Sequence, residues 1–238
     1  MFIRVLSHEL RSFFRDKMYT FLMIYPIMMA VVAYFLMPYL REQSNMIASN
    51  IVTVVFILLN SFMFGAIIGF SLLDDQDDQV LLSLKIAPIK VRYYVLIKLL
   101  ISYILGVIAT ILIILAGRFY DALSFKDLLF ITILTPFQGP IFALLINAFA
   151  NNKVEGFVIM KMSGIILLVP IAALFLTNAT EILIYFLPGF WTARIVSFSL
   201  LPVDFLLPST FIYFLLGLIV NGLVGLFFYK LYIKRVNI

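Results

Sequence analysis

The sequence contains six long stretches without a single Asp, Glu, Lys or Arg, and each is long enough to cross a lipid bilayer as a helix. Crossing the hydrocarbon core takes about 20 apolar helical residues. Because the apolar residues run continuously instead of alternating, helices are favoured over the strands of a membrane barrel. The sequence therefore predicts an all-α membrane protein made of one transmembrane domain, residues 1–238, with six transmembrane helices. These spans are expected at residues 18–40, 49–73, 95–117, 128–151, 158–180 and 207–229.

The composition agrees with this fold and excludes several classes of protein. Hydrophobic residues make up 64% of the chain and charged residues 12%, whereas soluble domains are about 45–50% apolar and about 25% charged. A soluble globular enzyme and a disordered chain are therefore excluded. The chain has no cysteine, which excludes disulfides, Fe–S clusters and thiolate zinc sites, and its single histidine excludes a multi-histidine metal site. We assign no catalytic residue and no metal ligand.

Two segments outside the spans are expected to be helical at the membrane surface. Residues 1–17 place arginines on one face and phenylalanine and leucine on the other, which predicts an amphipathic elbow helix lying on the bilayer. Residues 181–204 hold two apolar runs too short to span, so we expect a re-entrant helical hairpin in the outer leaflet, covered by protein. Trp191 beside Arg194 in this hairpin suggests anchoring at the membrane interface, with a role in a gate as the less favoured interpretation.

The Lys and Arg residues are divided unevenly between the two sides of the membrane. Of the 17, 13 fall in residues 1–17, 74–98 and 153–161 and in the tail from Lys230. The other four are Arg41, Arg118, Lys126 and Arg194. By the positive-inside rule the chain is a multi-pass protein of the cell membrane with both termini in the cytoplasm. The net charge of +5 then reflects orientation in the lipid bilayer, and no nucleic-acid partner is expected.

The strongest local feature is an acidic cluster directly after the second span. Its carboxylates cannot lie in hydrocarbon, so they are expected at the cytoplasmic edge. Residues 76–86 can form a short helix with an acidic first turn, which suits the helix dipole. The loop 74–90 is thus a place where a soluble partner could act. The residues with which the loop could grip such a partner are Asp74, Asp75, Asp77, Asp78, Leu81 and Leu84.

Polar and small residues inside the spans suggest contacts within the bundle. Ser61, Gly65 and Gly69 recur every four residues, a pattern of close helix packing, for which packing within the chain is favoured over a subunit interface. Two prolines in the fourth span predict a kink. An amide in hydrocarbon must face protein or a wet cavity. The candidate residues of a transport pathway are therefore Asn60, Phe64, Gln138 and Asn147.

Four motifs in this order and spacing carry a resemblance to a known family. They are RDKMYTFLMIYPI (15–27), GFSLLDDQDDQVLLSLKIAPI (69–89), NKVEGFVIMK (152–161) and LPGFWTARIV (187–196). With them the chain resembles the permease subunits of type-2 ATP-binding-cassette exporters, in particular the fluoroquinolone-transport branch. The family usually shows arginines where this chain has Gln76 and Gln79, so a salt bridge from those positions is not essential here.

The resemblance implies a transport complex of several chains. Two permeases, either two copies or a related pair, each contact a separate ATPase subunit that holds ATP and Mg²⁺. The loop after the second span would be the coupling helix, the outer hairpin would cap the pathway, and the second and fifth spans would line it. The sequence has no G-x-x-x-x-G-K-[ST] motif, so we expect no enzyme activity and no cofactor in this chain. The short outer loops and apolar walls favour an amphipathic cargo: a drug, a lipid-like compound or a hydrophobic peptide. The resemblance to exporters implies that the cargo moves outward.

Two other functions remain open. The DDQDD string of residues 74–78 fits the D-D-x-x-D pattern with which membrane prenyltransferases hold Mg²⁺ and a diphosphate. Such enzymes need a second acidic cluster, and the remaining acids here are scattered singly. A membrane scaffold without transport would share the architecture but would not depend on an ATPase. A gene for an ATPase beside this one would distinguish the exporter from both alternatives.

Overall fold

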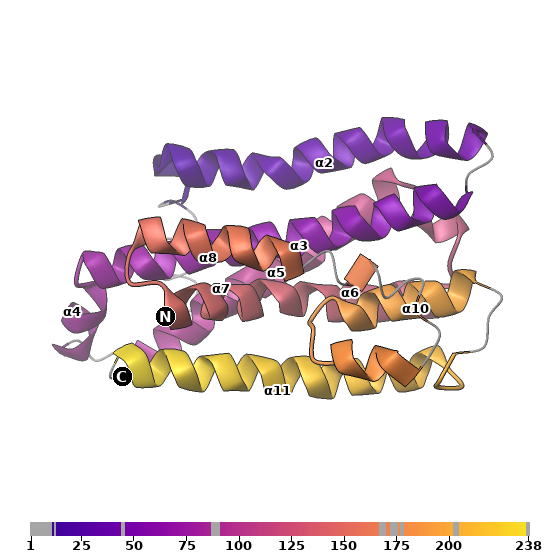
Figure 1. Ribbon diagram of the computed structural model, residues 1–238. Helices are drawn as coiled ribbons and strands as arrows, with labels where there is room; N and C mark the ends of the chain where they lie inside the picture. The colour runs from indigo at the N-terminus through magenta and orange to yellow at the C-terminus, as the bar shows by residue number, and fades with distance from the viewer. Residues whose placement is uncertain are drawn as a thin grey trace.

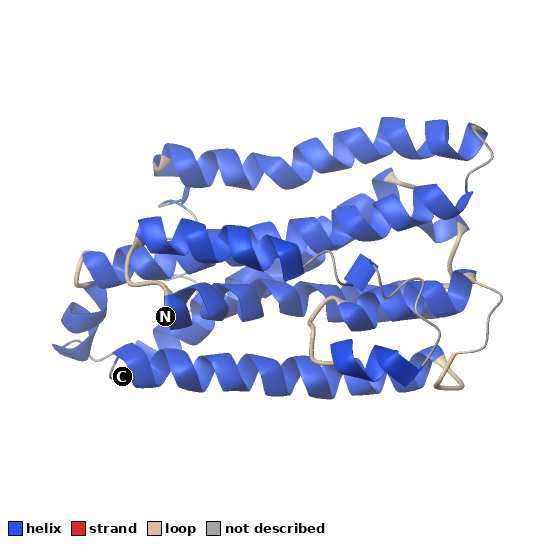
Figure 2. Ribbon diagram, in the orientation of Figure 1, coloured by secondary structure: helices blue, strands red, loops and turns tan. Residues whose placement is uncertain are grey.

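The structure is a computed structural model that describes residues 11, 13–43, 46–86, 91–166, 170–171, 176, 179–201 and 205–236. These residues form helices and connecting turns without a strand, so the all-α prediction is confirmed for the described part of the chain (Figure 2). Its long helices lie side by side along one direction (Figure 1). The elements are α2 (Lys17–Glu42), α3 (Met46–Asp77), α4 (Val80–Ile86), α5 (Val91–Ala116), η1 (Phe119–Asp121), α6 (Phe125–Leu134), η2 (Thr135–Phe137), α7 (Gln138–Phe149), α8 (Lys153–Ile166), η3 (Ala179–Ile184), α10 (Phe190–Leu200) and α11 (Thr210–Val236).

Five helices of the described residues are long and apolar enough to cross a membrane. They are α2, α3, α5, the α6 to α7 segment and α11. The chain is therefore a multi-pass membrane protein. The expected fifth span, 158–180, begins within α8, and much of it after Ile166 lies outside the described residues. This span, and with it the total of six, stays a prediction. Residues 1–10 and 12 also lie outside the described part, and with them most of the expected elbow helix.

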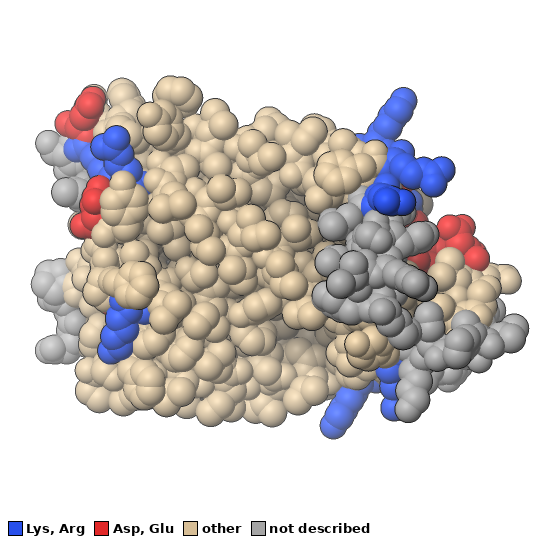
Figure 3. Space-filling view, turned by 180° about the vertical axis from the view of Figure 1, so that it is seen from behind, with Lys and Arg blue, Asp and Glu red and all other residues tan. Residues whose placement is uncertain are grey.

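Charged residues gather at the two ends of the bundle and leave a broad uncharged band between them (Figure 3). We name the ends by their short helices. The α4 end holds α4, the start of α2 and the end of α11, and the α10 end holds α10, η3 and the end of α2 (Figure 1). This distribution suits a bilayer that surrounds the middle of the bundle. Which end faces the cytoplasm stays a prediction from the Lys and Arg distribution.

Helix α3 lies at the centre of the bundle and packs against α2, α5 and α7. In an apolar 18-residue window of α3, 67% of the residues are buried, whereas the corresponding windows of α2 and α11 are 17% buried. The small residues of α3 explain the close packing on α7, because a Cβ on Gly65 would lie 2.6 Å from the carbonyl oxygen of Gly139. A Cβ on Gly69 would likewise meet Ile146 and Ala143 of α7. The prediction that this small-residue face packs within the chain is confirmed.

The fourth span is irregular where its prolines occur. Helix α6 ends at Leu134, a 3-10 turn covers Thr135–Phe137, and α7 begins at Gln138. Proline lacks the backbone N–H of an α-helical hydrogen bond, which explains the break at Pro136. A Cβ on Gly106 of α5 would lie 3.1 Å from the Cβ of Pro136, so α5 approaches closely at this point. The structure therefore shows a change of helix type at the first proline, and the predicted kink itself stays a prediction.

Helix α2 lies on the outside of the bundle and is held at both of its ends by polar contacts. At the α4 end, the hydroxyl of Tyr19 donates to a carboxylate oxygen of Asp74 over 2.5 Å. At the α10 end, Nη2 of Arg41 donates to the carbonyl oxygens of Gly117 and Arg118 over 2.8 and 3.1 Å. Between these ends α2 exposes many large apolar side chains, as a lipid-facing helix does.

Candidate functional site

The acidic cluster lies at the end of α3 and not in the first turn of a separate helix. Helix α3 continues to Asp77, the chain turns at Asp78 and Gln79, and α4 begins at Val80. Gln79 has a φ of 57°, which breaks the helix. The expectation of one short helix over 76–86 with an acidic first turn is therefore wrong. Acids at a helix C-terminus oppose the helix dipole, but here two of them have cationic partners on neighbouring helices.

The first partner is Lys98, which is buried in α5. Its Nζ lies 2.5 Å from Oδ2 of Asp75 and 2.7 Å from Oγ of Ser71. The hydroxyl of Tyr94 donates to the same Asp75 oxygen over 3.1 Å. The side chain of Lys98 is 1% exposed and that of Asp75 is 13% exposed. A buried lysine is tolerated because a carboxylate and a hydroxyl receive its N–H groups, and the pair joins α3 to α5.

The second partner is Lys153 at the start of α8. Its Nζ lies 2.7 Å from Oδ1 of Asp74, whose other oxygen accepts the Tyr19 hydroxyl. The ammonium group also lies 5.7 Å from the centre of the Tyr19 ring. Asp74 thus joins α2, α3 and α8. Both members of this ion pair are about one-third exposed, so water screens it more than the Lys98 pair.

A third contact at the α4 end joins α3, α7 and α11 through Asn147. Nε2 of Gln76 donates to Oδ1 of Asn147 over 2.8 Å. Nδ2 of Asn147 donates to the carbonyl oxygens of Gly69 and Ala143, and Nη1 of Arg235 donates to its backbone oxygen over 2.6 Å. The hydrogen-bonding groups of the Asn147 side chain therefore have partners within the chain. Its suggested role in a transport pathway stays a prediction, with a structural role now visible beside it.

The remaining coupling candidates fall into two groups. Asp77 and Asp78 are exposed at the tip of the α4 end. Leu81 is 3% exposed and packs with Val91 and Tyr94 of α5, and Leu84 is half-buried against the same cluster. The two carboxylates are available to a partner, whereas the leucines hold α4 against the bundle.

The other pathway candidates lie in the interior of the bundle. Asn60 and Gln138 are fully buried, and neither amide has a hydrogen-bond partner among the described residues. Phe64 is buried in the apolar core. Nε2 of Gln138 lies 3.2 Å from the position of a Cβ on Gly189, which places it against the segment before α10. An unsatisfied buried amide costs about 1–3 kcal/mol. Neither residue lines one of the two cavities described below, so a ligand would reach these amides only after the surrounding helices move apart.

The α10 end contains a fully buried ion pair between Glu181 and Arg194, with side chains 1% and 0% exposed. Oε1 of Glu181 accepts the hydroxyl of Tyr185 over 2.7 Å. The guanidinium group lies 5.3 Å from the ring centre of Phe190 and 5.0 Å from that of Phe205. Arg194, counted above among the outward-facing positive charges, is therefore a structural group held between two aromatic rings.

Trp191 is not an interfacial anchor, and that interpretation is wrong. Its side chain is 1% exposed, and its Nε1 donates to the backbone oxygen of Tyr185 over 2.9 Å. A Cβ on Gly217 would lie 2.9 Å from the Cβ of Trp191, so the tryptophan packs directly on α11. Within the hairpin segment, Phe190 and Trp191 belong to the core, whereas Phe186 is exposed.

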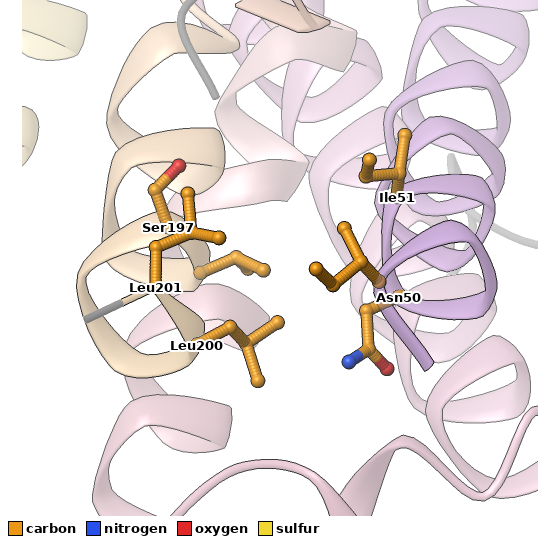
Figure 4. A pocket seen from close by; sticks show the side chains of 7 residues that line it. Asn50, Ile51, Ser197, Leu200 and Leu201 are labelled. Carbon is orange, nitrogen blue, oxygen red and sulfur yellow. The ribbon is translucent and has the colours of Figure 1, made fainter. Parts of the chain in front are cut away.

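A cavity of about 30 Å³ lies between the start of α3 and α10 (Figure 4). Asn50 and Ile51 line it from α3, and Ser197, Leu200 and Leu201 line it from the other side. Oδ1 of Asn50 is buried without a hydrogen-bond partner among the described residues. A space of this size suits about one or two water molecules that would satisfy the amide, and it is too small for a cargo.

The comparisons with known proteins agree with this architecture. The model of the family described as "Fluoroquinolones export permease protein Rv2686c-like" matches residues 9–229. The chain belongs to this family. Two relatives, the fluoroquinolones export permease proteins Rv2686c and MT2760 of Mycobacterium tuberculosis strains ATCC 25618 / H37Rv and CDC 1551 / Oshkosh, are each 22% identical over 199 residues. The match covers 79% of this chain and 78% of each relative. No solved structure matches the chain.

Membership of the export-permease family confirms the resemblance found in the sequence and identifies a membrane transport protein. The sequence motifs did not reveal the pairings that the structure shows. Lys98 gave one signal, since a charged residue inside an apolar span needs a partner. Asp75 as that partner, and Arg194 as the partner of Glu181, follow only from the packing of separate helices.

Proposed function

We propose that this chain is the membrane-spanning permease subunit of an ATP-binding-cassette exporter. The observation that carries the proposal is the match of the export-permease family over residues 9–229 of a chain with five candidate membrane spans. In this proposal a separate ATPase subunit binds ATP and Mg²⁺, and a second permease, identical or related, completes the pathway. Both termini and the α4 end face the cytoplasm, where the ATPase docks.

The proposed cargo is an amphipathic compound that moves outward, and a fluoroquinolone is the first to test because the relatives are named for its export. The interior amides of Asn60 and Gln138 support a pathway that accepts hydrogen-bonding groups. Apolar helix surfaces around them suit a cargo that also dissolves in lipid.

The proposed coupling surface is the exposed tip formed by Asp77 and Asp78 with α4 beside it. Exposed carboxylates offer charge-assisted hydrogen bonds to Arg or Lys of a partner. A force on α4 reaches the bundle directly, because Leu81 packs on Val91 and Tyr94 of α5. Tyr94 in turn binds Asp75, so α4, α5 and α3 respond together.

The test uses membrane vesicles that contain the permease and a candidate ATP-binding-cassette ATPase subunit from the same organism. We expect ATP-dependent accumulation of a fluorescent fluoroquinolone in inside-out vesicles. Charge reversal by Asp77→Lys with Asp78→Lys should remove co-purification of the ATPase and at least about 90% of transport, because like charges then face the partner. Leu81→Ser is a poorer test, since that buried side chain also holds α4 in place.

The matched control is Glu42→Lys, which reverses an exposed carboxylate at the α10 end. It should leave co-purification and transport unchanged. Accumulation that persists without ATP, or full transport by the double reversal, would show that the ATPase does not act through this surface.

The prenyltransferase-like alternative has less support. Asp74 and Asp75 are the first carboxylates of the acidic string, and each is already paired with a lysine and a tyrosine of other helices. A diphosphate-binding Mg²⁺ site needs these oxygens as ligands. The family match also favours transport.

A further inference from the structure

A groove of about 620 Å³ lies between α5, α7 and α11. None of the pathway or coupling candidates discussed above lines it, although Phe137 and Pro140, which do, flank Gln138 in the chain. Leu96, Leu100 and Leu226 line it and are about half exposed, so the groove opens sideways and not at an end of the bundle. In a bilayer this side faces hydrocarbon. The volume lies in the range of about 300–1,000 Å³ that ligand pockets occupy.

The described residues that line the groove are apolar apart from one asparagine and two tyrosines. Asn221 of α11 is 1% exposed, and neither its Oδ1 nor its Nδ2 has a hydrogen-bond partner among the described residues. Tyr103 is not such a partner, because its hydroxyl donates to the carbonyl oxygen of Ile133 over 3.1 Å. Asn221 therefore brings an unused donor and an unused acceptor to an apolar wall, where an amide needs a partner.

The space beside Asn221 comes from the next residue. A Cβ on Gly222 would meet no heavy atom within 4 Å, so the backbone of α11 borders open space there. From Asn221 to Tyr229 the groove follows α11 for about 12 Å, at 1.5 Å per residue. A flat molecule can lie along this stretch with one polar atom near Asn221, whose buried amide must turn toward the groove to meet it.

We propose that this groove binds a membrane-dissolved small molecule with an apolar body and one carbonyl or hydroxyl group that hydrogen-bonds to Asn221. The lateral opening requires a ligand that arrives through lipid, and the single amide selects one uncharged polar group. No charged side chain is among the described lining residues, so the groove does not suit a phospholipid headgroup. The site stands on its own geometry and does not depend on the proposed transport function.

Benzophenone is a suitable probe, because it has one carbonyl on an apolar body and inserts into neighbouring C–H bonds when irradiated. The purified chain in detergent should be labelled saturably, with the label mapped by mass spectrometry to peptides of α5, α7 and α11. Diphenylmethanol, which carries a hydroxyl, should suppress labelling at about five- to tenfold lower concentration than diphenylmethane, which carries none. This ratio is the effect of one hydrogen bond.

Two variants and one control test the assignment. Gly222→Leu fills the open space and should abolish the saturable labelling. Asn221→Leu should keep labelling but bring the two competitors to about equal potency, because the hydrogen-bonding group is gone. Gly164→Leu is the matched control, since a Cβ on Gly164 of α8 also meets no atom within 4 Å and lies away from the groove. It should label like the original chain.

Three results would overturn the proposal. Equal competition by the two compounds in the original chain would show that Asn221 makes no hydrogen bond to a ligand. Unchanged labelling of Gly222→Leu would place the probe elsewhere. A phospholipid that co-purifies with the chain, is lost in Gly222→Leu and is not displaced by diphenylmethanol would identify a lipid as the occupant. If Asn221→Leu fails to fold, the competitor ratio in the original chain and the Gly222→Leu result still decide.

Discussion

The two ends of the bundle differ in how deeply their ion pairs are buried. At the α10 end, Glu181 and Arg194 form an ion pair that is excluded from water and packed against aromatic rings, beside a weaker and partly exposed pair of Arg41 and Asp121. At the α4 end, ion pairs of Asp74 and Asp75 connect separate helices and range from nearly buried to about one-third exposed. A buried pair has one favourable arrangement, since either partner alone is strongly unfavourable. Partly exposed pairs can separate into water at a smaller cost.

This difference indicates which end can change its shape. The contacts at the α4 end join α2, α3, α5 and α8. When these helices move apart, water can hydrate the charged groups that leave their ion pairs. The buried pair of Glu181 and Arg194 gains no such hydration unless the core around it opens. We therefore expect conformational change to begin at the α4 end and the α10 end to stay packed.

The largest predicted effect is the loss of one charge at the α10 end. Arg194→Met leaves Glu181 buried without its cation, so the free energy of unfolding should fall by about 3–5 kcal/mol. The measurement is thermal or denaturant unfolding in detergent. The double variant with Glu181→Gln should recover most of the loss. A decrease below about 1 kcal/mol in the single variant would show that water reaches the pair.

A smaller effect is predicted for the corresponding change at the α4 end. Lys98→Met removes the cation beside Asp75, whose side chain is 13% exposed and can gain water. The free energy of unfolding should fall by about 2–3 kcal/mol. Asp75→Asn in the same chain should restore part of it. If Lys98→Met costs more than Arg194→Met, the proposed order of the two ends is reversed.

The hydrogen bond between Tyr19 and Asp74 is expected to contribute less again. Tyr19→Phe keeps the ring and removes the hydroxyl, so the free energy of unfolding should fall by about 0.5–1.5 kcal/mol. Hydrogen exchange in α2 should increase near its start and stay unchanged near Arg41. Tyr39→Phe, at an exposed position of the same helix, is the control and should change neither quantity. Faster exchange along the whole of α2 would contradict this local effect.

The smallest effect concerns pH. Hydrogen bonds from the backbone N–H and then the side chain of Asn151 lower the pKa of Glu155 below its ordinary value of 4.5. The turn before α8 should therefore keep these bonds near neutral pH and lose them only as the pH falls through the lowered pKa. The carboxyl carbon shift of Glu155 should titrate with a midpoint below 4.5. A midpoint at or above that value would exclude the stabilising contact, and Glu155→Gln should remove the pH dependence of the Asn151 amide signal.

The helical fold could be predicted because each span is apolar over its own length, and that property needs no knowledge of its neighbours. The helix face made of the small residues Ser61, Gly65 and Gly69 could also be predicted, because their spacing of four residues matches the period of a helix. Trp191 was misjudged because it packs on Gly217 of α11, which comes from a distant part of the chain. The end of α3 was misjudged because Lys98 and Lys153 neutralise acids that would otherwise favour the start of a helix.

Only part of the candidate site could be predicted from the sequence, for the same reason. Exposure of Asp77 and Asp78 followed from their charge, whereas the burial of Leu81 depends on how α4 folds back onto α5. Asn60 and Gln138 were recognised as amides in hydrocarbon. Asn221 carries the same amide group but was not singled out. What distinguishes it is the groove beside Gly222, which no sequence pattern records.

The outer helix α2 has a mechanical consequence. It packs on α3 and α5 through buried residues such as Ala33 and Met37, and its polar contacts at Tyr19 and Arg41 lie about 33 Å apart at 1.5 Å per residue. A rod pinned at both ends transmits displacement: if one pin shifts along the membrane normal, the other must slip or the rod must bend. Pro26 and Pro38 are the points where it bends most easily. Helix α2 thus connects the two ends of the bundle along its own axis, in addition to its packing on α3.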